Sequence, residues 1–141
     1  MEKFESILLK NNWPKREKPI SEVNQKIEQE LGFKLPLDYI NFLENYFGNE
    51  SFIGNQFIDL FGYEKLLEAN KDYEVFDTLF KTIAIGGNGA GELIAIEILN
   101  LQKIRMVLTP AIGLSKENHI KVGDSFTDFL SKLESGIKWF D

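Results

Sequence analysis

The chain has 141 residues, no cysteine and a formal net charge of −6, and 43% of its residues are hydrophobic. This length suits one domain with one core, and the lack of cysteine excludes disulfides and thiolate metal sites. The acidic balance argues against nucleic acid as a partner, because phosphate contacts dominate that affinity. We predict a single domain over residues 1–141 that stays in the cytoplasm and does not bind membranes, because the sequence shows neither a signal-peptide pattern nor a membrane-length apolar run.

The first third of the chain predicts three helices. Residues 2–10 place apolar side chains at helical spacing, and a second helix is expected from a cap at Ser21 to a stop at Gly32. A third helix is expected from Pro36 to Gly48, with a broad apolar face that we interpret as core. The residues of that face are Tyr39, Ile40, Phe42, Leu43, Tyr46 and Phe47.

The middle of the chain predicts mostly strands. Apolar alternation in FIGNQFIDLF, from residue 52, indicates a strand or a strand pair, and YEKLLEAN, from residue 63, has helical spacing. The following KDYEVFDTLFK is either a short helix or a loop with aromatic anchors. Two strands flanking a glycine-rich loop, and a third in IRMVLT, are joined by short links, which favour an antiparallel sheet.

The C-terminal part predicts one capped helix. In GDSFTDFLSKLESG, Ser125 with Asp128 three residues later approximates a capping box, and Gly136 ends the helix. With helices first, strands in the middle and a helix last, the sequence predicts an α+β fold in which helices flank an antiparallel β-sheet.

The glycine-rich loop in IAIGGNGAGELIAI, residues 83–96, either turns the chain or cradles a phosphate. Glu92 stands where the dinucleotide motif needs its third glycine, and Gly91 is not followed by the lysine of a P-loop. The residues after the loop alternate as in a strand, whereas both phosphate motifs open a helix. We therefore interpret the loop as a β-hairpin connection, for which Asn88-Gly89 is a strong signal.

Residues suited to catalysis are sparse. His119 is the single histidine, lies between a predicted turn and a predicted strand, and is expected to be a surface or hydrogen-bonded structural residue. Glu92 and Glu97 are an odd number of residues apart on one strand, so they should point to opposite faces of the sheet. Asp59 could approach Glu92 if their strands lie close. We predict no catalytic residue, no metal and no cofactor.

Polar and acidic residues gather near the predicted loops, some of them beside aromatic residues. Loops on a rigid scaffold often carry binding residues, and acidic groups interleaved with aromatic ones suit a basic protein surface. The predicted partner contacts are Asn49, Glu50, Asn55, Asp72, Glu74, Asp77, Asn88 and Glu92.

Three stretches resemble motifs of the SUKH superfamily, also called SMI/KNR-type proteins. ELGFKLPLDYINFLENYFG resembles its N-terminal signature, IAIGGNGAGELIAI its central strand, turn and strand, and GDSFTDFL its closing helix. Together they span roughly residues 20–134 in the expected order. The resemblance implies an α+β domain with an antiparallel sheet flanked by helices.

The resemblance also implies a role. Bacterial members are typically immunity proteins that neutralise toxin domains, many of them nucleases, of polymorphic or contact-dependent toxin systems. We therefore expect a non-catalytic protein-binding module whose partner is a basic toxin domain. The alternative is a regulatory scaffold of cell-wall or glucan synthesis, as in the fungal relatives. A third hypothesis, with the least support in the sequence, is an enzyme or small-ligand binder that uses Asn88, Glu92 and His119.

Overall fold

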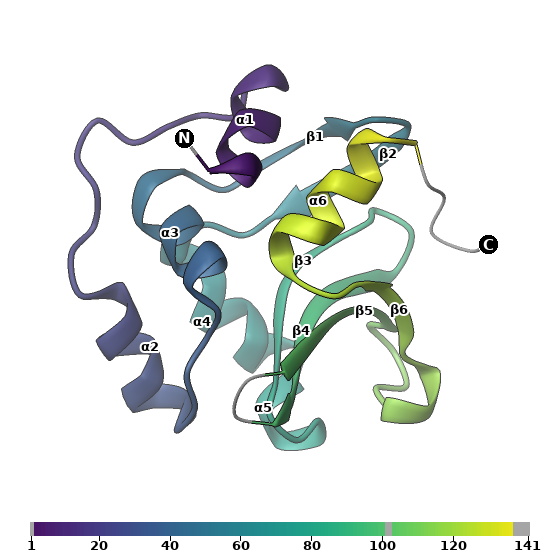
Figure 1. The fold of residues 1–141 in the computed structure, drawn as a ribbon. Helices are drawn as coiled ribbons and strands as arrows, with labels where there is room; N and C mark the ends of the chain where they lie inside the picture. Colours follow the sequence, from purple (N-terminus) through teal and green to yellow (C-terminus); the bar gives the residue numbers. More distant parts are fainter. Residues whose placement is uncertain (1, 101–102, 137–141) are drawn as a thin grey trace.

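The computed structural model describes residues 2–100 and 103–136. The predicted domain of residues 1–141 includes a few residues outside these ranges, and its boundaries stay a prediction. The elements in chain order (Figure 1) are α1 (Lys3–Lys10), α2 (Val23–Leu31), α3 (Leu37–Asn45), β1 (Asn49–Ile53), β2 (Gln56–Leu60), α4 (Tyr63–Asp72), α5 (Val75–Thr78), β3 (Thr82–Gly87), β4 (Glu92–Asn100), β5 (Lys103–Pro110), a 3₁₀ turn η1 (Lys116–Asn118), β6 (Ile120–Gly123) and α6 (Phe126–Glu134).

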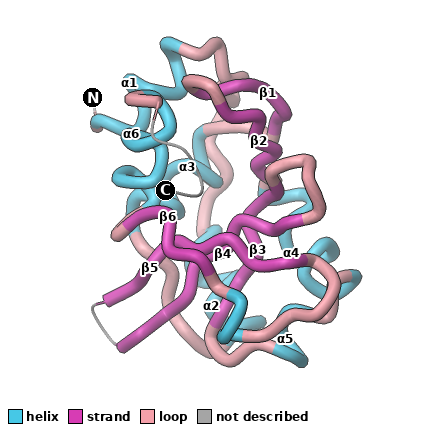
Figure 2. Tube along the Cα trace, turned by 90° about the vertical axis from the view of Figure 1, so that its right-hand side faces the viewer, coloured by secondary structure: helices cyan, strands magenta, loops and turns pink. Residues whose placement is uncertain are grey.

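The six strands form one antiparallel sheet in which each strand pairs with the next along the chain (Figure 2). β4 and β5 pair along most of their length, whereas β2 meets β3 only at Asp59↔Gly87 and Leu60↔Gly86. A Cβ at Gly86 would clash with the backbone carbonyl of Asp59, so this close approach requires glycine. The predicted α+β fold with an antiparallel sheet flanked by helices is confirmed.

The sheet curls around α6, which contacts both end strands, β1 and β6 (Figure 1). α1 and α3 pack against the same helix. Phe126 of α6 meets the rings of Tyr39 and Phe42 at centroid distances of 5.3 and 5.4 Å. Most of the aromatic face of the third helix is therefore core, as predicted, but Phe47 is 43% exposed.

The two predicted helix caps differ in outcome. Ser125 Oγ accepts from the Asp128 N–H, and the Asp128 carboxylate accepts from the Asp124 N–H, so the predicted cap of α6 is confirmed. The predicted Ser21 cap is wrong. Glu22 occupies the cap position of α2 in a left-handed conformation (φ 60°), and no side chain accepts from the helix there.

The third helix ends earlier than predicted, at Asn45 rather than near Gly48. Tyr46 is extended (φ −129°, ψ 153°) and forms an isolated antiparallel bridge with Lys15, while the Phe47 N–H donates to the Pro14 carbonyl. The connector between α1 and α2 thus supplies backbone partners for Tyr46 and Phe47. In a longer α3 these two residues would bond within the helix instead. The ambiguous segment after α4 contains the short helix α5.

Arg16 of that connector is a buried charge that joins three segments. Its Nε donates to the carbonyls of Leu43 and Tyr46, and its two terminal nitrogens donate to the Glu64 carboxylate at 2.7 and 2.8 Å. These hydrogen bonds from Arg16 hold the pKa of Glu64 below its usual value. The connector is therefore tied to the end of α3 and the start of α4.

β3 pairs with β2 over only two residues, and Asn70 of α4 provides hydrogen bonds to β3 beyond that short contact. Its side chain is fully buried. Oδ1 accepts from the Ala84 N–H at 2.7 Å, and Nδ2 donates to the carbonyls of Ala84 and Leu66 at 2.8 and 2.9 Å. The amide thereby satisfies both backbone groups of Ala84, as a neighbouring strand would.

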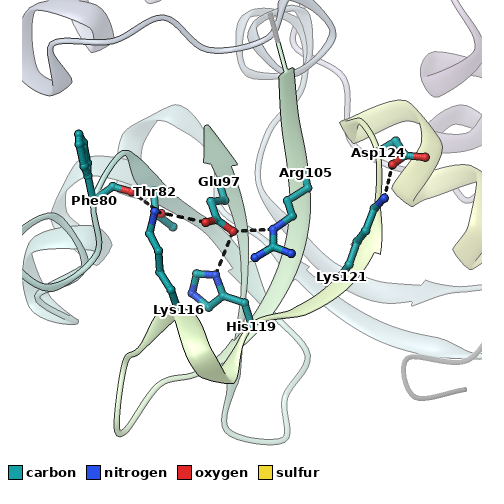
Figure 3. Close-up of polar contacts among 8 residues, drawn as sticks. All are labelled: Phe80, Thr82, Glu97, Arg105, Lys116, His119, Lys121 and Asp124. Atoms are coloured by element: carbon teal, nitrogen blue, oxygen red, sulfur yellow. Dashed lines mark hydrogen bonds and ion pairs between the residues drawn. The ribbon is translucent and has the colours of Figure 1, made fainter. Parts of the chain in front are cut away.

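A cluster of charged and polar side chains around one buried carboxylate attaches the connection between β5 and β6 to the sheet (Figure 3). Glu97 of β4 is 4% exposed. Its Oε1 accepts from Arg105 Nε at 2.7 Å and lies 3.2 Å from His119 Nδ1, and its Oε2 lies 3.2 Å from Lys116 Nζ. Because an ionised carboxylate only accepts, Nδ1 of His119 carries the hydrogen. His119 is thus a hydrogen-bonded residue, as predicted.

Two opposing effects act on the pKa of Glu97. Burial raises it, because the charged form is desolvated, whereas the hydrogen bonds from Arg105, His119 and Lys116 together lower it below its usual value. The cluster therefore stabilises the fold while Glu97 is ionised.

We expect Asn70→Ala to lower the free energy of unfolding by about 2–4 kcal/mol, because it leaves buried backbone groups of Ala84 unpaired. Urea denaturation measures this change. Asn41→Ala, which removes an exposed hydrogen bond to Glu2, is the control and should change stability little. Equal stabilities of the two variants would contradict the role of Asn70.

Acid should weaken the wild-type protein more than the Glu97→Gln variant. The pKa of Glu97 is lower in the folded than in the unfolded state, so its contribution is complete above the unfolded value, about 4.3, and is lost as the pH falls through the folded pKa. Denaturation of both proteins between about pH 6 and pH 3 should show the steeper loss in the wild type. The matched control is Glu117→Gln, at an exposed carboxylate on the same connection. Parallel pH curves for wild type and Glu97→Gln would refute the assignment.

Candidate functional site

A surface pocket of about 580 Å³ lies where α4 meets the strands beside the glycine-rich loop. We call it the acidic pocket. β1 to β4 contribute residues to one side and α4 to the other, and the start of the β5–β6 connection also lines it. Its lining residues are Glu50, Phe57, Asp59, Phe61, Lys65, Glu68, Ala69, Asp72, Tyr73, Gly87, Gly89, Gly91, Glu92, Leu93 and Ala111.

The lining is strongly negative and partly aromatic. Five carboxylates face a single cation, Lys65, among these residues, and three of the remaining side chains are aromatic. Glu68 and Asp72 belong to α4, and the other three carboxylates to β1, β2 and β4. Across residues 2–100 and 103–136, no group of three or more His, Cys, Asp or Glu is arranged to hold a metal ion.

The strand register places two of the carboxylates directly opposite each other. Glu50 pairs with Asp59, and Asp59 pairs in turn with Gly87, which has no side chain to fill the pocket. Like charges in such a cross-strand pair are destabilising. Burial raises the pKa of Asp59, the charge of Lys65 lowers it, and the charge of Glu50 raises it to a smaller extent than Lys65 lowers it. The free protein therefore carries on the wall of the pocket a carboxylate whose charged form is disfavoured mainly by burial, with a like charge opposite it.

The glycine-rich loop is the predicted hairpin connection between β3 and β4. Asn88 Oδ1 accepts from the backbone N–H groups of Ala90 and Glu92, and its Nδ2 donates to Glu92 Oε1 at 2.9 Å. Within this loop the positive φ angles belong to Gly89 (75°) and Gly91 (89°). Asn88 thus shapes the turn and also orients a carboxylate of the pocket.

The acidic pocket brings together three of the predicted contacts, Glu50, Asp72 and Glu92. Asn88 adjoins it through its hydrogen bond to Glu92. The other four lie outside the lining: Asn49 begins β1, Asn55 lies in the β1–β2 turn, Glu74 precedes α5 and Asp77 lies within it. Asn49 and Glu50 therefore lie on a strand rather than in the loop that the sequence indicated. As partner contacts, all eight residues stay predictions.

Sequence reasoning missed the α4 side of the pocket apart from Asp72. A usable signal was present, because Lys65, Glu68, Ala69 and Asp72 follow the i, i+3, i+4, i+7 spacing of one helical face. Asp59 was considered as a possible neighbour of Glu92, and both residues do line the pocket.

The residues of the third hypothesis do not form one group. His119 contacts Glu97, whereas Asn88 contacts Glu92, and Glu97 does not line the acidic pocket. The geometry therefore favours recognition of a cationic group over a site built from these three residues.

No helix in the described part of the chain has both the length and the apolar character needed to cross a bilayer.

Two comparisons with known proteins bear on the identity of the chain. No curated protein matches the chain. Residues 20–132, about four fifths of the chain, match the family described as SMI1 / KNR4 family (SUKH-1), and this range contains every residue that lines the acidic pocket. The resemblance read from the sequence is confirmed, and the chain belongs to the SMI1/KNR4 family (SUKH-1).

Proposed function

We propose that this protein is a non-catalytic binding module that acts as an immunity protein in the cytoplasm. In this proposal it neutralises a toxin domain by receiving a basic part of the toxin's surface on the acidic pocket. The observation that carries the proposal is the Glu50–Asp59 pair, two carboxylates opposed across a strand pair at the wall of a pocket.

The energetics of that pair support a binding role. Local arrangements that oppose stability are found mostly where function requires them. A basic side chain from a partner would offset the repulsion between Glu50 and Asp59. The free energy of these two carboxylates would therefore be more favourable in the complex than in the free protein. The aromatic residues of the same pocket offer apolar area that a purely electrostatic contact would not have.

Membership of the SMI1/KNR4 family (SUKH-1) supports a protein-binding role in general. The immunity role follows from the resemblance to bacterial members, and the net charge of −6 suits a basic partner. The second candidate is a regulatory scaffold of cell-wall or glucan synthesis, which the same family match supports. The two candidates differ in the partner, which is toxic in the first case and harmless in the second.

The experiment is co-expression of the protein with the C-terminal domain of the polypeptide encoded beside it. Host growth is scored first, and complex formation is then measured by size-exclusion chromatography and calorimetry. Rescue of growth together with a stable complex supports immunity. A neighbour that is harmless and does not bind refutes immunity through this partner and favours the scaffold.

We expect Glu50→Gln and Asp59→Asn each to stabilise the free protein, by about 0.2–1 kcal/mol. Both variants remove a cross-strand repulsion, and Asp59→Asn also removes a charge that burial disfavours. The same variants should bind the partner more slowly, and the wild-type association rate should fall as salt increases. Thermal denaturation and stopped-flow kinetics measure the two effects.

The matched control is Glu17→Gln, which removes an equal charge at an exposed position outside the pocket. It should leave both stability and association nearly unchanged. If all three variants bound the partner equally well, the acidic pocket would not be the binding site.

A further inference from the structure

We infer that Lys65 is an internal cation of the acidic pocket, which occupies the place of a partner's basic side chain and must be displaced when the partner binds. This inference rests on the proposed function and adds a regulatory feature to the same site. It predicts that the free protein partly blocks its own binding pocket.

The position of Lys65 is the first observation. Its ammonium lies 5.1 Å from the centroid of the Phe61 ring, within the range of a cation–π contact. Phe61 is nearly buried, and its backbone N–H donates to the Ile85 carbonyl, so the ring is held in place. This contact does not depend on the carboxylates, and it shows that the pocket accommodates a cationic side chain over an aromatic face.

The second observation is that Lys65 is held loosely. Its side chain is exposed, and no ion pair joins it to a carboxylate in the described part of the chain, although five carboxylates line the same pocket and its charge acts on Asp59 from beyond ion-pair distance. An exposed cation–π contact contributes about 0.5–1 kcal/mol. Lys65 can therefore leave the ring at little cost.

The charges of the pocket favour exchange for a partner's cation. One ammonium balances only part of the charge of Glu50, Asp59, Glu68, Asp72 and Glu92. A lysine carried by a partner brings its own apolar contacts as well as its charge. Lys65, in contrast, reaches only those positions in the pocket that its fixed place on α4 permits. The partner class is thus a protein that presents a lysine-rich segment.

The test uses the full chain and tetralysine as the probe, with binding followed by NMR titration at low salt. Lys65→Met removes the charge and keeps an unbranched apolar side chain. Lys71→Met is the matched control, because Lys71 is an exposed lysine of the same helix that does not line the pocket. We expect Lys65→Met to tighten tetralysine binding about two- to fivefold, and Lys71→Met to change it less than Lys65→Met does.

The outcomes separate the inference from the function on which it rests. Tighter binding to Lys65→Met alone, with shifts of the Phe61 ring signals, supports displacement. Equal affinities for the wild type and both variants, with signals of the pocket perturbed, overturn the role of Lys65 and leave the pocket as the binding site. If tetralysine does not perturb the signals of the pocket residues in any of the three proteins, both the inference and the basic occupant are refuted.

Discussion

The pairing of Asn70 with both backbone groups of Ala84 joins the two sides of the acidic pocket. It fixes α4 to β3 at the place where β2 no longer reaches β3. Four residues that line the acidic pocket lie on α4, in the turns on either side of Asn70, and the opposite side belongs to the sheet. Because the pocket lies between these elements, this amide is one of the contacts that hold its two sides together.

The carboxylates of the protein differ in whether they have ion-pair partners. Glu97 is buried, and Arg105, Lys116 and His119 surround it, so its charge contributes to the fold. Glu50 and Asp59 face each other across β1 and β2, and neither has a partner of opposite charge within ion-pair distance in the described part of the chain. Glu97 and Arg16 have close partners of opposite charge, whereas Lys65 acts on Asp59 only from beyond ion-pair distance, so the Glu50–Asp59 pair marks the surface that we propose for the partner.

The contrast between Glu97 and the Glu50–Asp59 pair indicates how charge could drive binding in the proposed function. The binding module that we propose needs no reacting group, but it needs a surface whose free energy improves when the partner arrives. In this proposal the acidic pocket meets that requirement through charge, and Lys65 moderates the charge while the protein is free. Affinity would then reflect an exchange of one cation for another rather than the filling of an empty site.

The sequence by itself determined the elements whose signals are local. Apolar spacing in α1, the Ser125 cap of α6 and the Asn88 turn between β3 and β4 act over three or four residues, so the pattern suffices to predict them. The antiparallel arrangement followed from short links. Asn70 also carried a signal, as a polar residue four positions after Leu66 on the apolar face of α4.

Other features of the fold and of the acidic pocket were decided only when the elements came together in the tertiary structure. The early end of α3 depends on the connector between α1 and α2, where Lys15, 31 residues earlier in the chain, pairs with Tyr46. The opposition of Glu50 and Asp59 depends on the register that the Gly54-Asn55 turn sets between β1 and β2, and the sequence pattern left open whether this segment forms one strand or two. The joining of α4 to these strands requires a buried amide and a close backbone approach at Gly86. The end of α3 and the joining of α4 to the sheet are contacts between distant parts of the chain, and a local pattern carries no information about which distant groups will meet.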